Sequence, residues 1–263
     1  MNPRVVAIDS DIALNLKVKS AHVQGVYTST IHLLLDGQLI TVGHKVGHGK
    51  HHVVIDQVID FYAYDINAGS IVSFIDHRIK IEKLVIDVDE SSLRVYQPYT
   101  TTYRFDHQTL KTIQTLKEMI QSRHHHNVFS YPKNDPWLNY QFEKIDIFLH
   151  APGLPSALSI MGLGMGLTPL GDDVLTGFIL GQNTVGKSLP WIEKLIEEAK
   201  RKTNLLSCQN LQDTYNRYYP DPFIAMIEGL FVEHNIEKAT AILKLGATSG
   251  AGILSGFIYG LLA

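Results

Sequence analysis

The sequence reads Gly162-Leu163-Gly164-Met165-Gly166-Leu167-Thr168-Pro169-Leu170-Gly171-Asp172-Asp173 at the point that decides the fold of its second half. The alternating glycines permit backbone conformations with positive φ, and the Gly-Asp-Asp end is typical of the start of a helix. A helix N-terminus presents unpaired N–H groups and a partial positive charge. The stretch therefore predicts a tight turn that leads into a helix whose start favours an anionic ligand.

A second stretch near the C-terminus echoes the first. The residues Gly250-Ala251-Gly252-Ile253-Leu254-Ser255-Gly256-Phe257 follow the pattern of Gly171-Asp172-Asp173-Val174-Leu175-Thr176-Gly177-Phe178, and Thr248 precedes them much as Thr168 precedes the first copy. Glycines four positions apart, such as Gly177 with Gly181 or Gly252 with Gly256, share one helix face. We expect close helix packing with the two starts side by side, where Thr248 and Ser249 can donate hydroxyl hydrogen bonds.

The residues from Gly25 to about Tyr103 have the alternation of strands instead. Asp36-Gly37 separates two apolar runs, residues 26–33 and 38–42, and this arrangement is a strong hairpin signal. Short runs rich in branched residues predict further strands at 52–55, 70–75 and 83–88. We expect a small β-barrel or sandwich, since either arrangement protects strand edges.

After Asp106 the apolar period becomes helical, beginning with Leu110, Ile113, Leu116 and Ile120. Further helices are expected at 191–202, 223–231, 236–245 and 251–263, with a break at the prolines Pro220 and Pro222 and an exposed loop within 121–136. The sequence therefore predicts an α+β protein with a β-rich domain over 1–106 and a helical domain over 107–263. The helical domain carries the Gly-rich Asp-Asp motif.

Composition indicates which kinds of binding partner and which cellular compartment to expect. The net charge of −3 makes a nucleic-acid partner unexpected, because no global basic field draws the chain to phosphates. The single cysteine, Cys208, excludes an internal disulfide and fits a reducing, cytoplasmic compartment. Residues 1–20 lack the apolar core of a secretory signal, and the apolar stretch 251–263 is shorter than the ~20 residues that span a bilayer. No membrane association is expected.

Asp172 and Asp173 are the strongest candidates for chemistry. One aspartate is enough to cap a helix, whereas two in the first turn repel each other unless a cation or a hydrogen-bond donor binds there. The candidates are Mg²⁺, an amide NH₂ group, or a Lys or Arg from elsewhere in the chain. The glycine run taken alone is equally consistent with a tight turn and a helix cap, and no cofactor is certain.

The other reactive side chains carry weaker signals. His44, His48, His51 and His52 cluster among glycines, and their spacing matches no zinc pattern. We expect a solvated turn with one histidine facing the cleft, and metal binding is the less favoured alternative. The run His124-His125-His126 lies in the expected loop and implies no function. Cys208 is expected to be a buried, inert thiol.

The residues Gly164-Met165-Gly166-Leu167-Thr168-Pro169-Leu170-Gly171-Asp172-Asp173-Val174-Leu175-Thr176-Gly177, with Gly246-Ala247-Thr248-Ser249-Gly250 downstream, resemble the AllH-type family. This family includes a subunit of oxamate carbamoyltransferase from allantoin and purine breakdown. The resemblance implies phosphorolysis of oxalurate to oxamate and carbamoyl phosphate, together with assembly with other carbamoyltransferase subunits. The chain departs from the family pattern at Leu170, where Ser is common, and at Gly252, where an acidic residue is frequent.

On this resemblance, the expected site binds a small anion: phosphate, carbamoyl phosphate or an oxalurate-like acid. Gly164, Gly166 and Gly171 form its cradle, while Asp172 and Asp173 orient the substrate or hold Mg²⁺. Substrate hydrogen bonds are assigned to Thr168, Thr248 and Ser249, and Leu167 and Gly250 complete the binding group. Two alternatives are a non-catalytic subunit that binds a small anion and an enzyme of Mg²⁺-dependent phosphoryl transfer.

Overall fold

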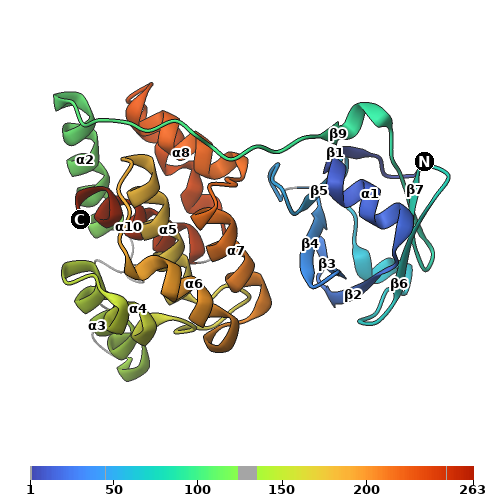
Figure 1. The fold of residues 1–263 in the computed structure, drawn as a ribbon, viewed down its shortest axis with the longest axis horizontal. Coiled ribbons are helices and arrows are strands. Elements are labelled where there is room, and N and C mark those ends of the chain that lie inside the picture. Colours follow the sequence, from blue (N-terminus) through green and yellow to red (C-terminus); the bar gives the residue numbers. More distant parts are fainter. Residues whose placement is uncertain (1, 45, 124–134, 247) are drawn as a thin grey trace. The chain divides into compact units, whose positions relative to one another are not determined.

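The computed structural model describes residues 2–44, 46–123, 135–246 and 248–263 (Figure 1). The chain divides into two compact units, Met1–Gln97 and Pro98–Ala263. The first unit holds the strands and the second is helical, which confirms the predicted α+β class. Within the described ranges, no helix combines the length and the apolar character needed to cross a membrane.

A single curled sheet forms the first unit. Its nine strands, counted over the described residues, follow the order β8-β7-β6-β2-β3-β4-β5-β1-β9. Their bounds are β1 (Val5–Asp9), β2 (Ala21–Val26), β3 (Thr30–Leu35), β4 (Gln38–Gly43), β5 (His52–Ile55), β6 (Ile71–Ile75), β7 (Arg78–Ile81), β8 (Leu84–Asp87) and β9 (Leu93–Arg94). A bridge between Arg4 and Asp87 joins the chain before β1 to the edge strand β8. The curled sheet is therefore closer to the expected barrel than to a sandwich.

The expected hairpin is present between β3 and β4. Leu35 pairs with Gln38, and Asp36 and Gly37 have φ values of 51° and 77°, the left-handed geometry that suits a two-residue turn between twisted strands. Strands at the other three expected positions are confirmed as β5, β6 and β8. The expected continuous strand over 26–33 is wrong, because β2 ends at Val26 and the Tyr27 N–H donates to the Thr30 carbonyl oxygen at 2.9 Å in a turn before β3.

Helix α1 (Ser10–Val18) covers the sheet and was not expected from the sequence. Its residues Ile12, Ala13 and Leu16 are buried in the same core as the strands, while Asp9 caps its start by accepting the Asp11 N–H at 2.8 Å. The unit also contains two short 3₁₀ helices, η1 (Phe61–Tyr64) and η2 (Glu90–Ser92).

The second unit is a bundle around two buried helices, α5 and α10. The bounds of its helices are α2 (His107–Arg123), α3 (Pro136–His150), α4 (Leu154–Ile160), α5 (Leu170–Thr184), α6 (Trp191–Lys202), α7 (Leu205–Tyr215), α8 (Asp221–Phe231), α9 (Ile236–Thr240), η3 (Ala241–Lys244) and α10 (Ser249–Leu262). The expected helices correspond to α2, α5, α6, α8, α9 with η3, and α10. The expected loop over 121–136 lies mostly outside the described residues, as does the histidine run.

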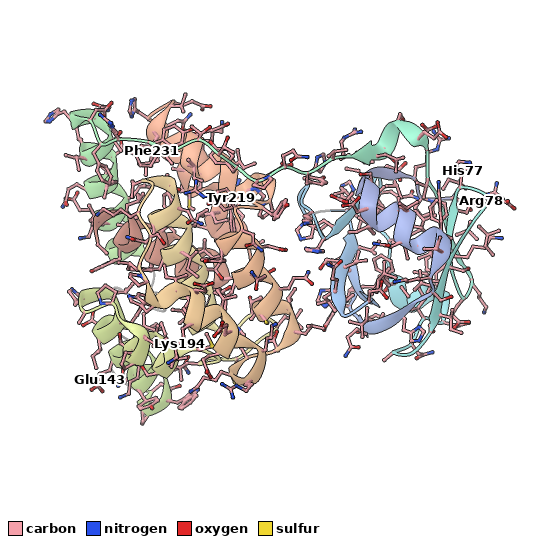
Figure 2. The ribbon with its side chains drawn as sticks, viewed as in Figure 1. His77, Arg78, Glu143, Lys194, Tyr219 and Phe231 are labelled. Carbon is pink, nitrogen blue, oxygen red and sulfur yellow. The ribbon has the colours of Figure 1, made fainter. Side chains whose placement is uncertain are left out.

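The segment that precedes α2 is fixed to the helical unit by two tyrosines. Tyr99 packs its ring 5.5 Å from that of Tyr219, and Tyr103 stacks 5.0 Å from Phe231. Figure 2 labels Tyr219 and Phe231. The Tyr99 N–H also donates to the Arg217 carbonyl oxygen at 2.8 Å. Because of these contacts, the second unit starts at Pro98, before its first helix.

Candidate functional site

Helices α5 and α10 pack so closely that only glycine fits at their contact. A Cβ built on Gly177 would overlap the Ile253 carbonyl oxygen, and one built on Gly256 would overlap the carbonyl oxygen of Val174. Four residues further along α5, a Cβ built on Gly181 would overlap the Phe257 carbonyl oxygen. Because contacts on both helices advance in the same direction, the two helices are parallel. Their N-termini therefore lie side by side, as the internal repeat predicts.

Leu170 and Gly252 meet at this junction. A Cβ built on Gly252 would lie 2.9 Å from Leu170 Cδ1 and 3.0 Å from Asp173 Cβ. Both distances are tighter than ordinary side-chain contacts, so a larger residue at Gly252 requires Leu170 to move. The pair Leu170 and Gly252 thus brings the start of α10 against the first turn of α5.

The loop between α4 and α5 is partly exposed. Gly164 and Gly166 have φ values of 126° and 105°, which L side chains rarely adopt, and Met165 between them is 83% exposed. The main-chain N–H groups of Gly164, Met165, Gly166 and Leu167 donate no hydrogen bond to another described residue. These amides are therefore available to an anion beside the two helix N-termini.

Both carboxylate oxygens of Asp172 accept hydrogen bonds from within the same unit. Its side chain is 1% exposed, and Oδ1 accepts the Gly162 N–H at 2.7 Å while Oδ2 accepts the hydroxyl of Thr203. Burial raises the pKa of Asp172, and the hydrogen bonds from Thr203 and Gly162 oppose that rise. Asp172 therefore ties the loop and the end of α6 to the first turn of α5.

Asp173 has a different environment. It is 4% exposed, and Oδ2 accepts a hydrogen bond from Thr168 Oγ1 at 3.3 Å. Burial raises the pKa of Asp173 to about 8; hydrogen bonds from Ser249 and Thr168 offset part of the rise, and the neighbouring Asp172 carboxylate adds to it. At neutral pH the protonated form of Asp173 is thus favoured, and a neutral carboxyl group can donate as well as accept.

The start of α10 supplies the second half of the site. Ser249 Oγ lies 3.0 Å from Thr168 Oγ1, so Thr168, Asp173 and Ser249 form one hydrogen-bonded group. Thr248 is the N-cap of α10, and its carbonyl oxygen accepts the Gly252 N–H at 3.0 Å. Gly250 is buried against η3 and lies within the helix, behind the hydroxyl groups.

Two residues at the site gave no signal in the sequence. Thr203 follows α6 and binds Asp172, and Asn204 Nδ2 donates to the Leu167 carbonyl oxygen at 3.0 Å, which holds the exposed part of the loop. Both lie more than thirty positions from their partners along the chain, so no local sequence pattern predicts these contacts. Gly171, assigned to the cradle, has its N–H bonded to the Leu163 carbonyl oxygen at 2.8 Å.

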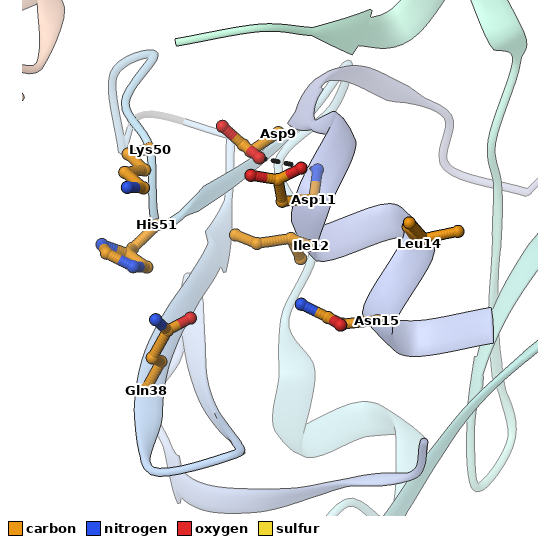
Figure 3. A pocket seen from close by; sticks show the side chains of 8 residues that line it. All are labelled: Asp9, Asp11, Ile12, Leu14, Asn15, Gln38, Lys50 and His51. Atoms are coloured by element: carbon orange, nitrogen blue, oxygen red, sulfur yellow. Dashed lines mark hydrogen bonds between the residues drawn. The ribbon is translucent and has the colours of Figure 1, made fainter. Parts of the chain in front are cut away.

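The remaining candidates belong to other elements of the fold. Among the residues that the structure describes, no three His, Cys, Asp or Glu side chains come together to hold a metal ion. Burial raises the pKa of the Cys208 thiol. His44 Nδ1–H donates to the Ile55 carbonyl oxygen at 2.9 Å, and His51 is buried in the wall of a pocket of the first unit (Figure 3).

In the helical unit, a loop and two parallel helix starts thus lie beside a polar group of two hydroxyls and one carboxyl, whose burial favours the protonated form. The family model of the oxamate carbamoyltransferase subunit AllH matches residues 160–261. The match runs from the end of α4 through most of α10, contains every residue assigned to the site, and confirms the resemblance. No curated protein and no solved structure matches the chain. The match shows that this part of the chain is similar to that family.

Proposed function

We propose that this chain is a subunit of an oxamate carbamoyltransferase and carries a site for carbamoyl transfer between oxalurate and phosphate at the paired starts of α5 and α10. The observation that carries the proposal is the group formed by Thr168, Asp173 and Ser249 beside the free loop amides, within the residues that the family model matches. Two parallel helix N-termini add their partial positive charges at one place, which favours a phosphate or a developing oxyanion.

The proposed reaction assigns separate roles to the loop and the hydroxyl group. A phosphate oxygen attacks the terminal ureido carbon of oxalurate, and the bond from that carbon to the inner nitrogen breaks. The amides of Gly164, Met165 and Gly166 stabilise the negative charge on phosphate and on the carbonyl oxygen. The products are carbamoyl phosphate and oxamate, whose nitrogen must gain one proton.

Asp173 supplies that proton through a hydroxyl group. Its carboxyl is favoured in the protonated form at neutral pH and contacts Thr168, which in turn contacts Ser249. A proton passes from Asp173 through Thr168 or Ser249 to the leaving nitrogen, and the hydroxyl proton of the attacking hydrogen phosphate returns to Asp173. Asp172, with both oxygens already bonded, is a positioning residue and a poor ligand for Mg²⁺.

The test is the formation of carbamoyl phosphate from oxalurate and phosphate, with the chain alone and with its partner subunits. We expect activity only in the assembled enzyme, and we expect Asp173→Asn to reduce it about a hundredfold, the effect of losing a general acid. The matched control is Glu193→Gln, an exposed first-turn acid of α6 in the same unit. Full activity of the Asp173→Asn assembly would favour the alternative, a non-catalytic subunit.

A further inference from the structure

One polar side chain is buried on the apolar face of α3. Gln141 is 3% exposed, in line with the residues of the helix that face the core. The other buried residues of α3 are apolar and belong to the core that also holds Leu170; they are Phe142, Ile145, Phe148 and Leu149. A carboxamide at such a position is costly unless its polar atoms find partners.

The carboxamide of Gln141 has no hydrogen-bond partner among the residues that the structure describes. Most buried side-chain amides in folded proteins are hydrogen-bonded, either to the chain or to something that the chain binds. The oxygen of this group can accept two hydrogen bonds and its nitrogen can donate two. Gln141 is therefore a polar group prepared for a ligand or for an ordered water molecule.

The position of Gln141 favours a ligand, because its side chain reaches the loop between α4 and α5. A Cβ built on Gly164 would lie 3.5 Å from Gln141 Oε1 and 2.6 Å from the main-chain nitrogen of Leu170. The Leu170 N–H, in the first turn of α5, donates to no described residue. An unpartnered carboxamide and a free helix-start amide thus lie beside the same glycine of the anion loop.

We propose that Gln141 recognises the carbamoyl group of the substrate through its NH₂. The inference rests on the proposed function and names the residue that sets its specificity. A primary amide donates through its nitrogen and accepts through its oxygen, and a glutamine carboxamide offers the complementary pair. Gln141 Oε1 accepts an N–H of the carbamoyl NH₂, and Nε2 donates to the carbamoyl oxygen.

The groups that carry the proposed reaction do not supply this acceptor. The main-chain N–H groups of the loop only donate, and the hydroxyls of Thr168 and Ser249 are bonded to each other and to Asp173. An acetyl group has nearly the shape of a carbamoyl group, but a methyl group replaces the NH₂. A site that accepts an N–H rejects an analogue without one, because its buried acceptor then stays unpaired.

The experiment titrates the full chain with carbamoyl phosphate, acetyl phosphate and inorganic phosphate, without partner subunits. It follows the main-chain amide NMR signals and the side-chain NH₂ signals of Gln141, which are identified by their absence from Gln141→Met. We expect carbamoyl phosphate to shift these side-chain signals more than acetyl phosphate does. Carbamoyl phosphate should also bind at least about tenfold more tightly than acetyl phosphate.

Gln141→Met and Gln141→Leu replace the carboxamide with apolar groups of similar size. Both should bind carbamoyl phosphate about tenfold more weakly and bind acetyl phosphate and inorganic phosphate as the wild type does. Their urea midpoints should equal or exceed that of the wild type, because a buried polar group without a partner is removed. Gln114→Met, at an exposed glutamine of α2, is the control and should change neither binding nor the midpoint.

The inference is overturned if the wild type binds carbamoyl and acetyl phosphate equally, or if its preference persists in both Gln141 variants. It is also overturned if the variants weaken all three ligands alike and lower the urea midpoint, since Gln141 would then only support the loop through water. The wild-type comparison decides the question alone if neither variant folds. In each of these cases inorganic phosphate still shifts the wild-type loop signals of residues 164–167. Absence of those shifts would instead mark failure of the proposed anion site.

Discussion

Thr168 Oγ1 and Ser249 Oγ lie 3.0 Å apart although 81 positions separate them in the chain. The contact exists because α5 and α10 are parallel and begin at the same level. It joins the two copies of the internal repeat into one polar group with Asp173. The proposed chemistry depends on this junction more than on either stretch alone.

The hydroxyl pair should show energetic coupling. Thr168→Val and Ser249→Ala each remove one partner, and a double-mutant cycle on urea unfolding should give an interaction free energy of about 1 kcal/mol. Thr115→Val is a control, since Thr115 is a half-buried threonine on α2 whose hydroxyl donates within its own helix, to the Lys111 carbonyl oxygen. Strict additivity of the Thr168 and Ser249 changes would show that the two hydroxyls do not interact in solution.

The glycine contacts between α5 and α10 should limit stability. Gly177→Ala and Gly256→Ala place a Cβ against a carbonyl oxygen of the other helix, and we expect each to lower the free energy of unfolding by about 3 kcal/mol. Gly153→Ala, whose Cβ meets nothing closer than 3.9 Å, should cost less than about 1 kcal/mol. Equal small losses at Gly177, Gly256 and Gly153 would be incompatible with the described packing.

Asp172 should be a stability residue. Asp172→Asn presents an NH₂ group to the Gly162 N–H or the Thr203 hydroxyl, both of which donate to the native carboxylate. We expect the variant to lose about 1–3 kcal/mol of unfolding free energy, measured in urea. Thr203→Val should lose less, because it removes only one of the two bonds. A fully stable Asp172→Asn protein would mean that these bonds are replaced by water.

Asp173 should make stability depend on pH. Its pKa is about 8 in the fold against an ordinary value of 3.8, so between these values the folded chain binds more protons than the unfolded chain. The free energy of unfolding should therefore fall as the pH rises from about 4 to about 8. Asp173→Asn has no carboxyl group to titrate at this position. Its free energy of unfolding, measured in urea across this pH range, should therefore fall less steeply than that of the wild type. Parallel curves for the two proteins would place the Asp173 pKa near its ordinary value.

Local signals explain what the sequence could predict. The Asp36-Gly37 turn, the glycine spacing of α5 and α10 and the amphipathic pattern of α6 depend on near neighbours, and each is present. The start of α1 was missed because Asp9-Ser10-Asp11 is too short to separate a helix cap from a strand end. The different surroundings of Asp172 and Asp173 were not visible, since they depend on Thr203 and Ser249, which the fold brings from distant positions.

The most direct test of the central claim is a titration of the full chain with phosphate, followed by its amide NMR signals. We expect saturable shifts at Gly164, Met165, Gly166 and Leu167, with a weaker response at Ser249, and loss of these shifts in the Thr168→Val, Ser249→Ala double variant. Loop signals that stay unmoved while phosphate binds elsewhere, or that move equally in the double variant, would contradict an anion site at the paired helix starts.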